Sequence, residues 1–195
     1  MNIASKNDIK ELAKFMTCYD QNLFDSVVRK VHSENAKSHI TSIFLSHSHV
    51  DADIIFPIVV FLHGYGIDVY VDWMDKTLDE VPNAETACKL KQKIKENSKF
   101  IFLATNDSLS SKWCNWEIGY GDSFKYIDNI AIFPLLRYNE IWKGQEYLKI
   151  YPIIKLKYDN VNLKSLDDFY IEAESTSECN ITKYFLKIPQ PESRN

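Results

Sequence analysis

Apolar and polar residues alternate along this chain in two kinds of segment: short, nearly continuous apolar runs, and longer stretches with helical spacing. Runs of this short, uninterrupted kind are typical of strands that are buried on both faces of a sheet. Five of them are found, at residues 42–46, 66–72, 99–104, 130–136 and 151–156. Because helix-like segments separate these runs, the pattern predicts an α/β fold with a parallel sheet covered by helices on both faces.

Two of the intervening segments carry helix start signals. Asp51 or Asp53 can cap a very apolar helix through residues 56–62, and Asn83 can cap a helix that turns Leu90 and Ile94 inward. Both helices end before the next apolar run, so the alternation is regular.

The flanks fall outside this alternation. Residues 1–41 carry apolar side chains at helical spacing and are predicted to form a helical extension of two helices, packed on the core or on a second subunit. Residues 158–195 are more polar and are predicted to form a C-terminal extension packed on the central domain, which spans residues 42–157.

Composition narrows the class of protein. Of the 195 residues, 45% are hydrophobic and 13% aromatic, enough for a substantial core. A formal charge of -4 offers no basic surface, which argues against nucleic acid as a partner. No apolar stretch approaches the roughly 20 residues that span a bilayer, and the charged N-terminus is unlike a secretory signal. We therefore expect a cytoplasmic protein without a membrane partner.

Several kinds of site are disfavoured by what the chain lacks. His47, His49 and Asp51 alternate like metal ligands, but no further histidine follows His63 to complete a ligand set. The cysteines have no paired spacing, so neither a zinc site nor a disulfide framework is predicted. Glycine-rich phosphate and dinucleotide loops and a G-x-S-x-G elbow are absent, and Cys114 has no histidine at a fixed spacing. We expect no bound metal and no Rossmann-type cofactor.

One loop and helix carry the most suggestive pattern. After the apolar run at 99–104, Ser110 or Ser111 can cap a helix on which Trp113 and Glu117 stand one turn apart. A carboxylate is thereby placed near the end of a buried strand. In open α/β sheets ligands bind at that rim.

These features together resemble the Toll/interleukin-1 receptor (TIR) domain family, in its bacterial branch. Three stretches carry the resemblance in the family's order: residues 43–48 as the first strand and loop, residues 69–72 leading into a long loop, and residues 111–117 with a W-x-x-x-E pattern. The resemblance implies the family's flavodoxin-like fold with five parallel strands, here preceded by N-terminal helices.

In catalytic members of the family, the glutamate of this pattern is essential for cleaving NAD+ between nicotinamide and ribose. The resemblance therefore implies that Glu117 is the catalytic residue and that NAD+ is a substrate, with no separate cofactor. It also implies NAD+-binding roles for a set of residues around Glu117. These are Ser46, His47, Asp72, Trp73 and Trp113. Some catalytic relatives carry arginines in the first loop, whereas Ser48 and His49 stand here, so backbone N–H groups and Lys76 or Lys112 are left to contact the diphosphate.

A TIR chain of this size is similar to the TIR component of anti-phage Thoeris systems. That similarity implies a signalling nucleotide derived from NAD+, expected to be a cyclic form of ADP-ribose, that activates a downstream effector. In catalytic relatives the long loop after the second strand completes the site of a neighbouring subunit, which implies self-association through TIR surfaces.

Two alternatives remain open at the level of sequence. One is a non-enzymatic TIR adaptor that works by TIR–TIR association, with Glu117 as a surface residue. The other is an enzyme like the nucleoside deoxyribosyltransferases, which share the alternation and also use a glutamate. The first alternative predicts no turnover of NAD+, and the second predicts turnover of nucleosides only.

Overall fold

The computed structural model describes most of the chain. The described residues are 3–19, 41–63, 65–75, 78, 83–137, 139–157, 165–173 and 176–186. The second predicted N-terminal helix, within residues 20–40, lies outside them.

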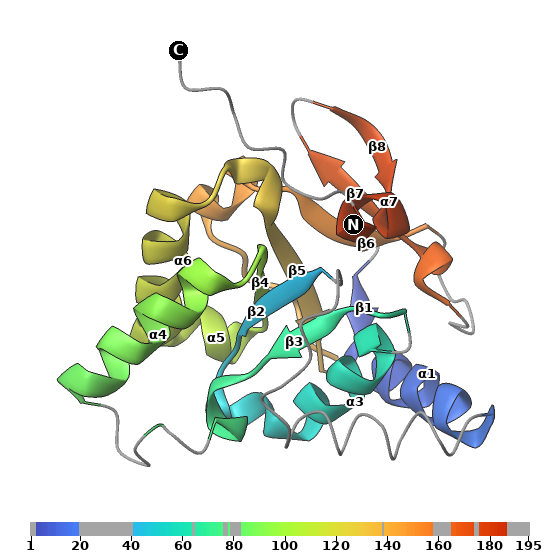
Figure 1. Ribbon diagram of the computed structural model, residues 1–195. Helices are drawn as coiled ribbons and strands as arrows, with labels where there is room; N and C mark the ends of the chain where they lie inside the picture. Colours follow the sequence, from blue (N-terminus) through green and yellow to red (C-terminus); the bar gives the residue numbers. More distant parts are fainter. Residues whose placement is uncertain are drawn as a thin grey trace.

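The predicted parallel sheet is confirmed (Figure 1). Its five strands are β2 (Ser42–Ser46), β3 (Asp68–Tyr70), β4 (Lys99–Ala104), β5 (Ile130–Leu136) and β6 (Ile153–Leu156). They lie in the order β3-β2-β4-β5-β6, and each neighbouring pair is parallel. This is the strand order of flavodoxin-like domains, in which the first strand lies between the second and the third.

Beyond these five strands, the sheet takes in both flanks of the chain. β7 (Phe169–Ala173) pairs antiparallel with β6, and β8 (Thr176–Asn180) pairs antiparallel with β7. The short strand β1 (Ala4–Ser5) pairs in parallel with the end of β5. Segments before residue 42 and after residue 157 therefore extend the same sheet.

Helices cover both faces of the sheet (Figure 1). On one face lie α1 (Lys6–Tyr19) and α3 (Ala52–His63), which pack on each other. On the other lie α4 (Ala84–Glu96) and α6 (Lys112–Phe124). Strand β2 serves both layers, because Ile43 and Leu45 pack toward α3 while Phe44 packs with residues of α4 and α6.

The shorter elements connect these layers. They are α5 (Asn106–Ser110), α7 (Ile181–Leu186) and the 3-10 turns η1 (His49–Asp51), η2 (Asp72–Met74), η3 (Ile127–Asn129), η4 (Glu146–Ile150) and η5 (Leu166–Asp168). In the described part of the chain, every helix falls short of the length and apolar character needed to cross a membrane.

Helix α6 begins and packs as its sequence dictates. The Ser111 hydroxyl accepts a hydrogen bond from the backbone N–H of Cys114 at 3.3 Å, which confirms the predicted serine cap. One turn after Glu117, Gly121 faces strand β4, and a Cβ there would lie 3.1 Å from the Phe100 ring. Glycine at this position lets α6 approach the sheet closely. The helix thereby brings Glu117 against the strands.

Candidate active site

The carboxyl group of Glu117 is buried beside the end of strand β2. Only 4% of the residue is exposed, and its Oε2 accepts a hydrogen bond of 2.6 Å from the Ser46 hydroxyl. Among the described residues, none donates a hydrogen bond to Oε1 of Glu117. Glu117 is thus buried, whereas the adaptor alternative expects it at the surface.

Burial also changes the acidity of this group. Loss of solvation raises the pKa of Glu117 from 4.5 to about 8, against the Ser46 hydrogen bond, which lowers the pKa. The negative charge of Asp72 raises the pKa further. A carboxyl group whose pKa lies near neutrality because of burial and a nearby charge is a common feature of active sites.

The sheet explains why Ser46 and Glu117 meet. Ser46 is the last residue of β2 and points to the same side as Phe44, the side covered by α6. Strands β2, β3 and β4 are parallel, so their carboxyl ends share one edge, where β2 and β3 lead into the residues predicted for the site. The site lies at the position where ligands bind in flavodoxin-like sheets.

His47 and Asp72 come together at this edge. The His47 side chain is 1% exposed, and its Nε2 lies 3.5 Å from Oδ1 of Asp72, whose side chain is 21% exposed. The Nδ1 of His47 lies 3.1 Å from the carbonyl oxygen of Leu45. Burial lowers the pKa of His47 below its ordinary value, although the charge of Asp72 acts in the opposite direction. His47 is therefore neutral at pH 7.

The two predicted tryptophans lie at the surface. Trp73 follows Asp72 in η2 and is 47% exposed, and its backbone N–H donates to Asp72 Oδ1 at 2.8 Å. Trp113 is 37% exposed and meets Trp116 edge to face, with 5.3 Å between ring centroids. The structure thus brings Ser46, His47, Asp72 and Glu117 together, and it places the indoles on the adjoining surface.

Two further residues lie in this region, and the sequence analysis assigned neither of them to the site. Cys114, one turn before Glu117 on the buried face of α6, donates from Sγ to the carbonyl oxygen of His47 at 3.1 Å. Burial, and then the charge of Glu117, raise the pKa of Cys114 to about 12, so the thiol is protonated. Tyr70 donates to Asp75 at 2.8 Å. The spacing of Cys114 and Glu117 at i and i+3 was a signal for the first of these.

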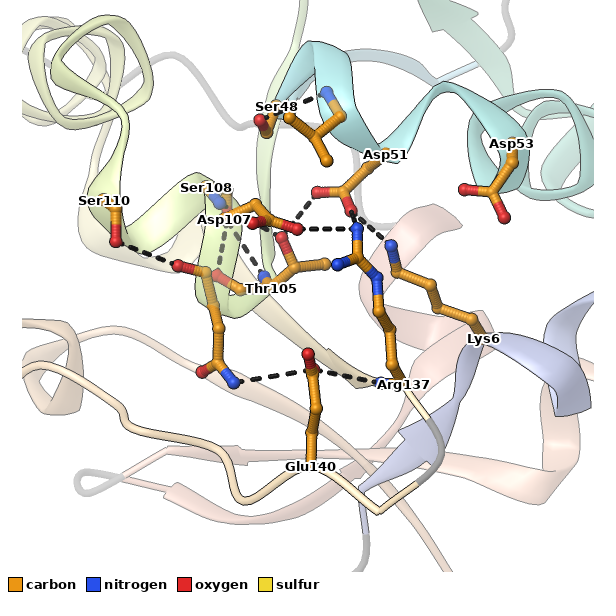
Figure 2. Close-up of polar contacts among 12 residues, drawn as sticks. Lys6, Ser48, Asp51, Asp53, Thr105, Asp107, Ser108, Ser110, Arg137 and Glu140 are labelled. Atoms are coloured by element: carbon orange, nitrogen blue, oxygen red, sulfur yellow. Dashed lines mark hydrogen bonds and ion pairs between the residues drawn. The ribbon is translucent and has the colours of Figure 1, made fainter.

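The expectation that Asp51 caps the helix is wrong. Ser48 caps η1 instead, by accepting from the N–H of Val50. Asp51 is fully buried and binds the Lys6 ammonium and the Thr105 hydroxyl, as Figure 2 shows. Asp51 could not be recognised as buried from the sequence, because its partners lie 45 and 54 residues away.

Arg137 lies at the edge of this cluster (Figure 2). Its Nη2 is 2.7 Å from Asp107 Oδ2 and 3.8 Å from Asp51 Oδ1. Of the two lysines considered for a diphosphate, Lys112 is exposed at the start of α6, and Lys76 lies outside the described residues. No group of three or more His, Cys, Asp or Glu side chains suited to a metal ion occurs within the described ranges.

This chain shares sequence with known proteins. It is 32% identical over 163 residues to a Bacillus cereus (strain MSX-D12) protein named "Probable 3' cyclic ADP-D-ribose synthase ThsB'", a match that covers 79% of this chain and 83% of the relative. It is 28% identical over 110 residues to a Cytobacillus dafuensis protein named "Putative cyclic ADP-D-ribose synthase TIR2", covering 54% of this chain and 27% of that relative. The family model described as TIR domain matches residues 43–166, which include all six predicted site residues. With this match over more than half of its length and with the strand order of the family's fold, the chain belongs to the TIR domain family.

Proposed function

We propose that this protein is an NAD+-cleaving TIR enzyme that releases nicotinamide and forms a cyclic ADP-ribose-type nucleotide. The observation that carries the proposal is the buried Glu117 carboxyl group, held by Ser46 at the carboxyl edge of the sheet. Both relatives described above bear the name of a cyclic ADP-D-ribose synthase, which supports the same activity here.

The chemistry requires what this carboxyl group offers. Breaking the bond between nicotinamide and ribose leaves positive charge on the ribose, and a carboxylate beneath the ring stabilises that charge. Nicotinamide leaves as a neutral molecule, so no second acid is needed. Ser46 holds Oε2 in place, while Oε1 is available to the ribose hydroxyls.

The other predicted site residues would surround the substrate. His47 and Asp72 lie at the same edge, and Asp72 is close enough for its charge to act on Glu117. The exposed rings of Trp73 and Trp113 offer apolar surfaces for the aromatic parts of NAD+. In this assignment NAD+ is the substrate and no separate cofactor takes part.

The wider role follows the resemblance to the Thoeris TIR component. We propose that the nucleotide product serves as a signal in cytoplasmic anti-phage defence and reaches its effector by diffusion. Self-association through TIR surfaces would raise activity at high protein concentration.

A direct assay tests the proposed activity. Purified protein at high concentration is incubated with NAD+, nicotinamide release is followed, and mass spectrometry identifies the remaining nucleotide. A cyclic product is lighter than ADP-ribose by one water. An adaptor would release no nicotinamide at any concentration, and a deoxyribosyltransferase-like enzyme would exchange bases of nucleosides and leave NAD+ intact.

The acidity of Glu117 predicts the pH dependence. We expect kcat/KM for NAD+ to rise with pH and to level off above about pH 8, because only the carboxylate stabilises the ribosyl cation and its pKa is about 8. Well below this value, kcat/KM should fall about tenfold for each pH unit. The measurement is nicotinamide release at subsaturating NAD+ between pH 6 and 9.

Ser46→Ala tests the assignment of this profile to Glu117. The hydroxyl lowers the pKa of Glu117, so its removal should move the midpoint to higher pH. Ser123→Ala, which changes an exposed serine on α6 that bonds only its own helix, is the matched control and should keep the wild-type profile. A midpoint that does not move in Ser46→Ala would contradict the assignment.

A further inference from the structure

His47 and Asp72 present two hydrogen-bond acceptors to each other. The carbonyl oxygen of Leu45 can only accept, so the 3.1 Å contact places the proton of the neutral imidazole on Nδ1. Nε2 then carries a lone pair, and it lies 3.5 Å from a carboxylate oxygen that also carries lone pairs. The pair lacks one proton for a hydrogen bond between Nε2 and Oδ1.

The proton is lacking at a buried nitrogen atom. Nε2 of His47 is fully buried and has no hydrogen-bond partner in the described part of the chain. An unsatisfied buried polar atom costs free energy, and such atoms in native structures call for an explanation. Uptake of one proton would give Nε2 a hydrogen bond to Oδ1, which already accepts one from the backbone N–H of Trp73.

The pair is held in place next to Glu117. The backbone of His47 follows Ser46, which binds Glu117, and its carbonyl oxygen accepts from Cys114 on α6. Asp72 is the member of the pair that solvent and substrate can reach, and its charge acts on Glu117 as well as on His47. A proton released beside Glu117 can therefore reach the pair through Asp72.

We propose that His47 and Asp72 together act as the general base that accepts the proton of the nucleophile captured by the ribosyl cation. This inference rests on the proposed NAD+ cleavage. The bond between the ribose carbon and nicotinamide breaks, with its electron pair leaving on nicotinamide. A hydroxyl oxygen, of a second ribose or of water, forms the new bond to that carbon. Its proton moves to the pair and lies between Asp72 Oδ1 and His47 Nε2, from where it passes to solvent.

This division of labour leaves Glu117 ionised throughout the step. If Glu117 took the proton itself, the carboxylate would be lost while the ribose still carried positive charge. The other charged or titratable groups facing His47 are His49 and Asp51, whose effects on its pKa are opposite in sign. The proton acceptor is therefore defined by the contact with Asp72.

The test uses His47→Gln and Asp72→Asn in the full chain. Asp72→Asn is included because Asp72 lies on a partly exposed turn, so that its change does not disturb the core. The matched control is His63→Gln, the same substitution at the histidine that ends α3. Nicotinamide release from NAD+ is measured with and without sodium azide. Azide is an anionic nucleophile that carries no proton, so its capture by the ribosyl cation needs no base.

We expect both pair variants to lose about 100-fold in kcat, with KM for NAD+ changed less than about threefold. Azide should restore turnover at least about tenfold in both and yield an ADP-ribosyl azide. His63→Gln should behave as wild type. Unchanged kcat in the pair variants, or a loss that azide does not restore, would overturn the inference.

These outcomes are separate from failure of the proposed function. If wild-type protein released no nicotinamide, NAD+ cleavage itself would be wrong. If wild type released nicotinamide and Glu117→Gln did not, but azide had no effect on the pair variants, only the assignment of the base would fall.

Discussion

Replacing Glu117 by glutamine is expected to lower nicotinamide release from NAD+ by at least about 1,000-fold, since the carboxylate is the group that stabilises the ribosyl cation. Glutamine has nearly the same shape and can still accept the hydrogen bond from Ser46, so the loss reports on charge and not on packing. The measurement is kcat at saturating NAD+. The matched control is Glu85→Gln, at an exposed glutamate in the first turn of α4, which should keep wild-type activity.

The same variant shows whether folding is intact. The pKa of Glu117 is 4.5 in the unfolded chain and about 8 in the folded protein. The contribution of Glu117 to the free energy of unfolding is therefore fully present below pH 4.5 and is lost as the pH rises to about 8. This shift in the pKa of Glu117 corresponds to roughly 3 to 5 kcal/mol in the free energy of unfolding. The free energy of unfolding of Glu117→Gln should therefore exceed that of wild type increasingly between pH 5 and 8. Full activity in Glu117→Gln would contradict the assignment of Glu117 as the catalytic residue.

Replacing Asp51 by alanine is expected to lower the free energy of unfolding by about 3 to 5 kcal/mol, because it leaves the Lys6 ammonium buried without its partner. Lys6, like Asp51, is buried, and Figure 2 shows the two side chains meeting between the N-terminal segment and the start of α3. Removal of Asp51 also leaves the Thr105 hydroxyl without its acceptor. Urea denaturation followed by circular dichroism measures the change.

Asp53→Ala is the matched control for this experiment. Asp53 lies two residues further along and pairs with Lys10 of the same helix α1, but its side chain is 55% exposed. An exposed ion pair contributes less than about 1 kcal/mol to the free energy of unfolding. The double variant Lys6→Met with Asp51→Leu removes both charges. Its free energy of unfolding should fall less than that of Asp51→Ala alone. Equal losses for Asp51→Ala and Asp53→Ala would show that burial of the pair does not matter.

The ion pair of Asp51 with Lys6 also joins the N-terminal segment to the TIR domain. The TIR family model begins at residue 43, whereas Lys6 belongs to α1 and Ala4 pairs with Leu135 of β5. The N-terminal segment thus supplies a strand, a helix and a buried cation to the same core. Its removal would leave the Asp51 carboxylate buried without the lysine.

Local features were predicted well. The five parallel strands, the Asn83 and Ser111 caps and the placement of Glu117 in the first turns of a helix follow from residues close together in the sequence. Predictions that needed distant partners were less complete. Asp51 was assigned as a cap, and β1, β7 and β8 were not foreseen, since a short strand is stabilised by the strand it pairs with.

The order of strands and helices, the family, and the position of Glu117 near the carboxyl ends of parallel strands could all be predicted from the residues alone. These depend on the spacing of apolar side chains and on caps within one turn. The burial of Glu117 against Ser46, 71 residues away, and the contact between His47 and Asp72 became visible only in the folded structure. The acidity of each group depends on solvent exclusion and on charges from other strands, and both arise only when the chain is folded.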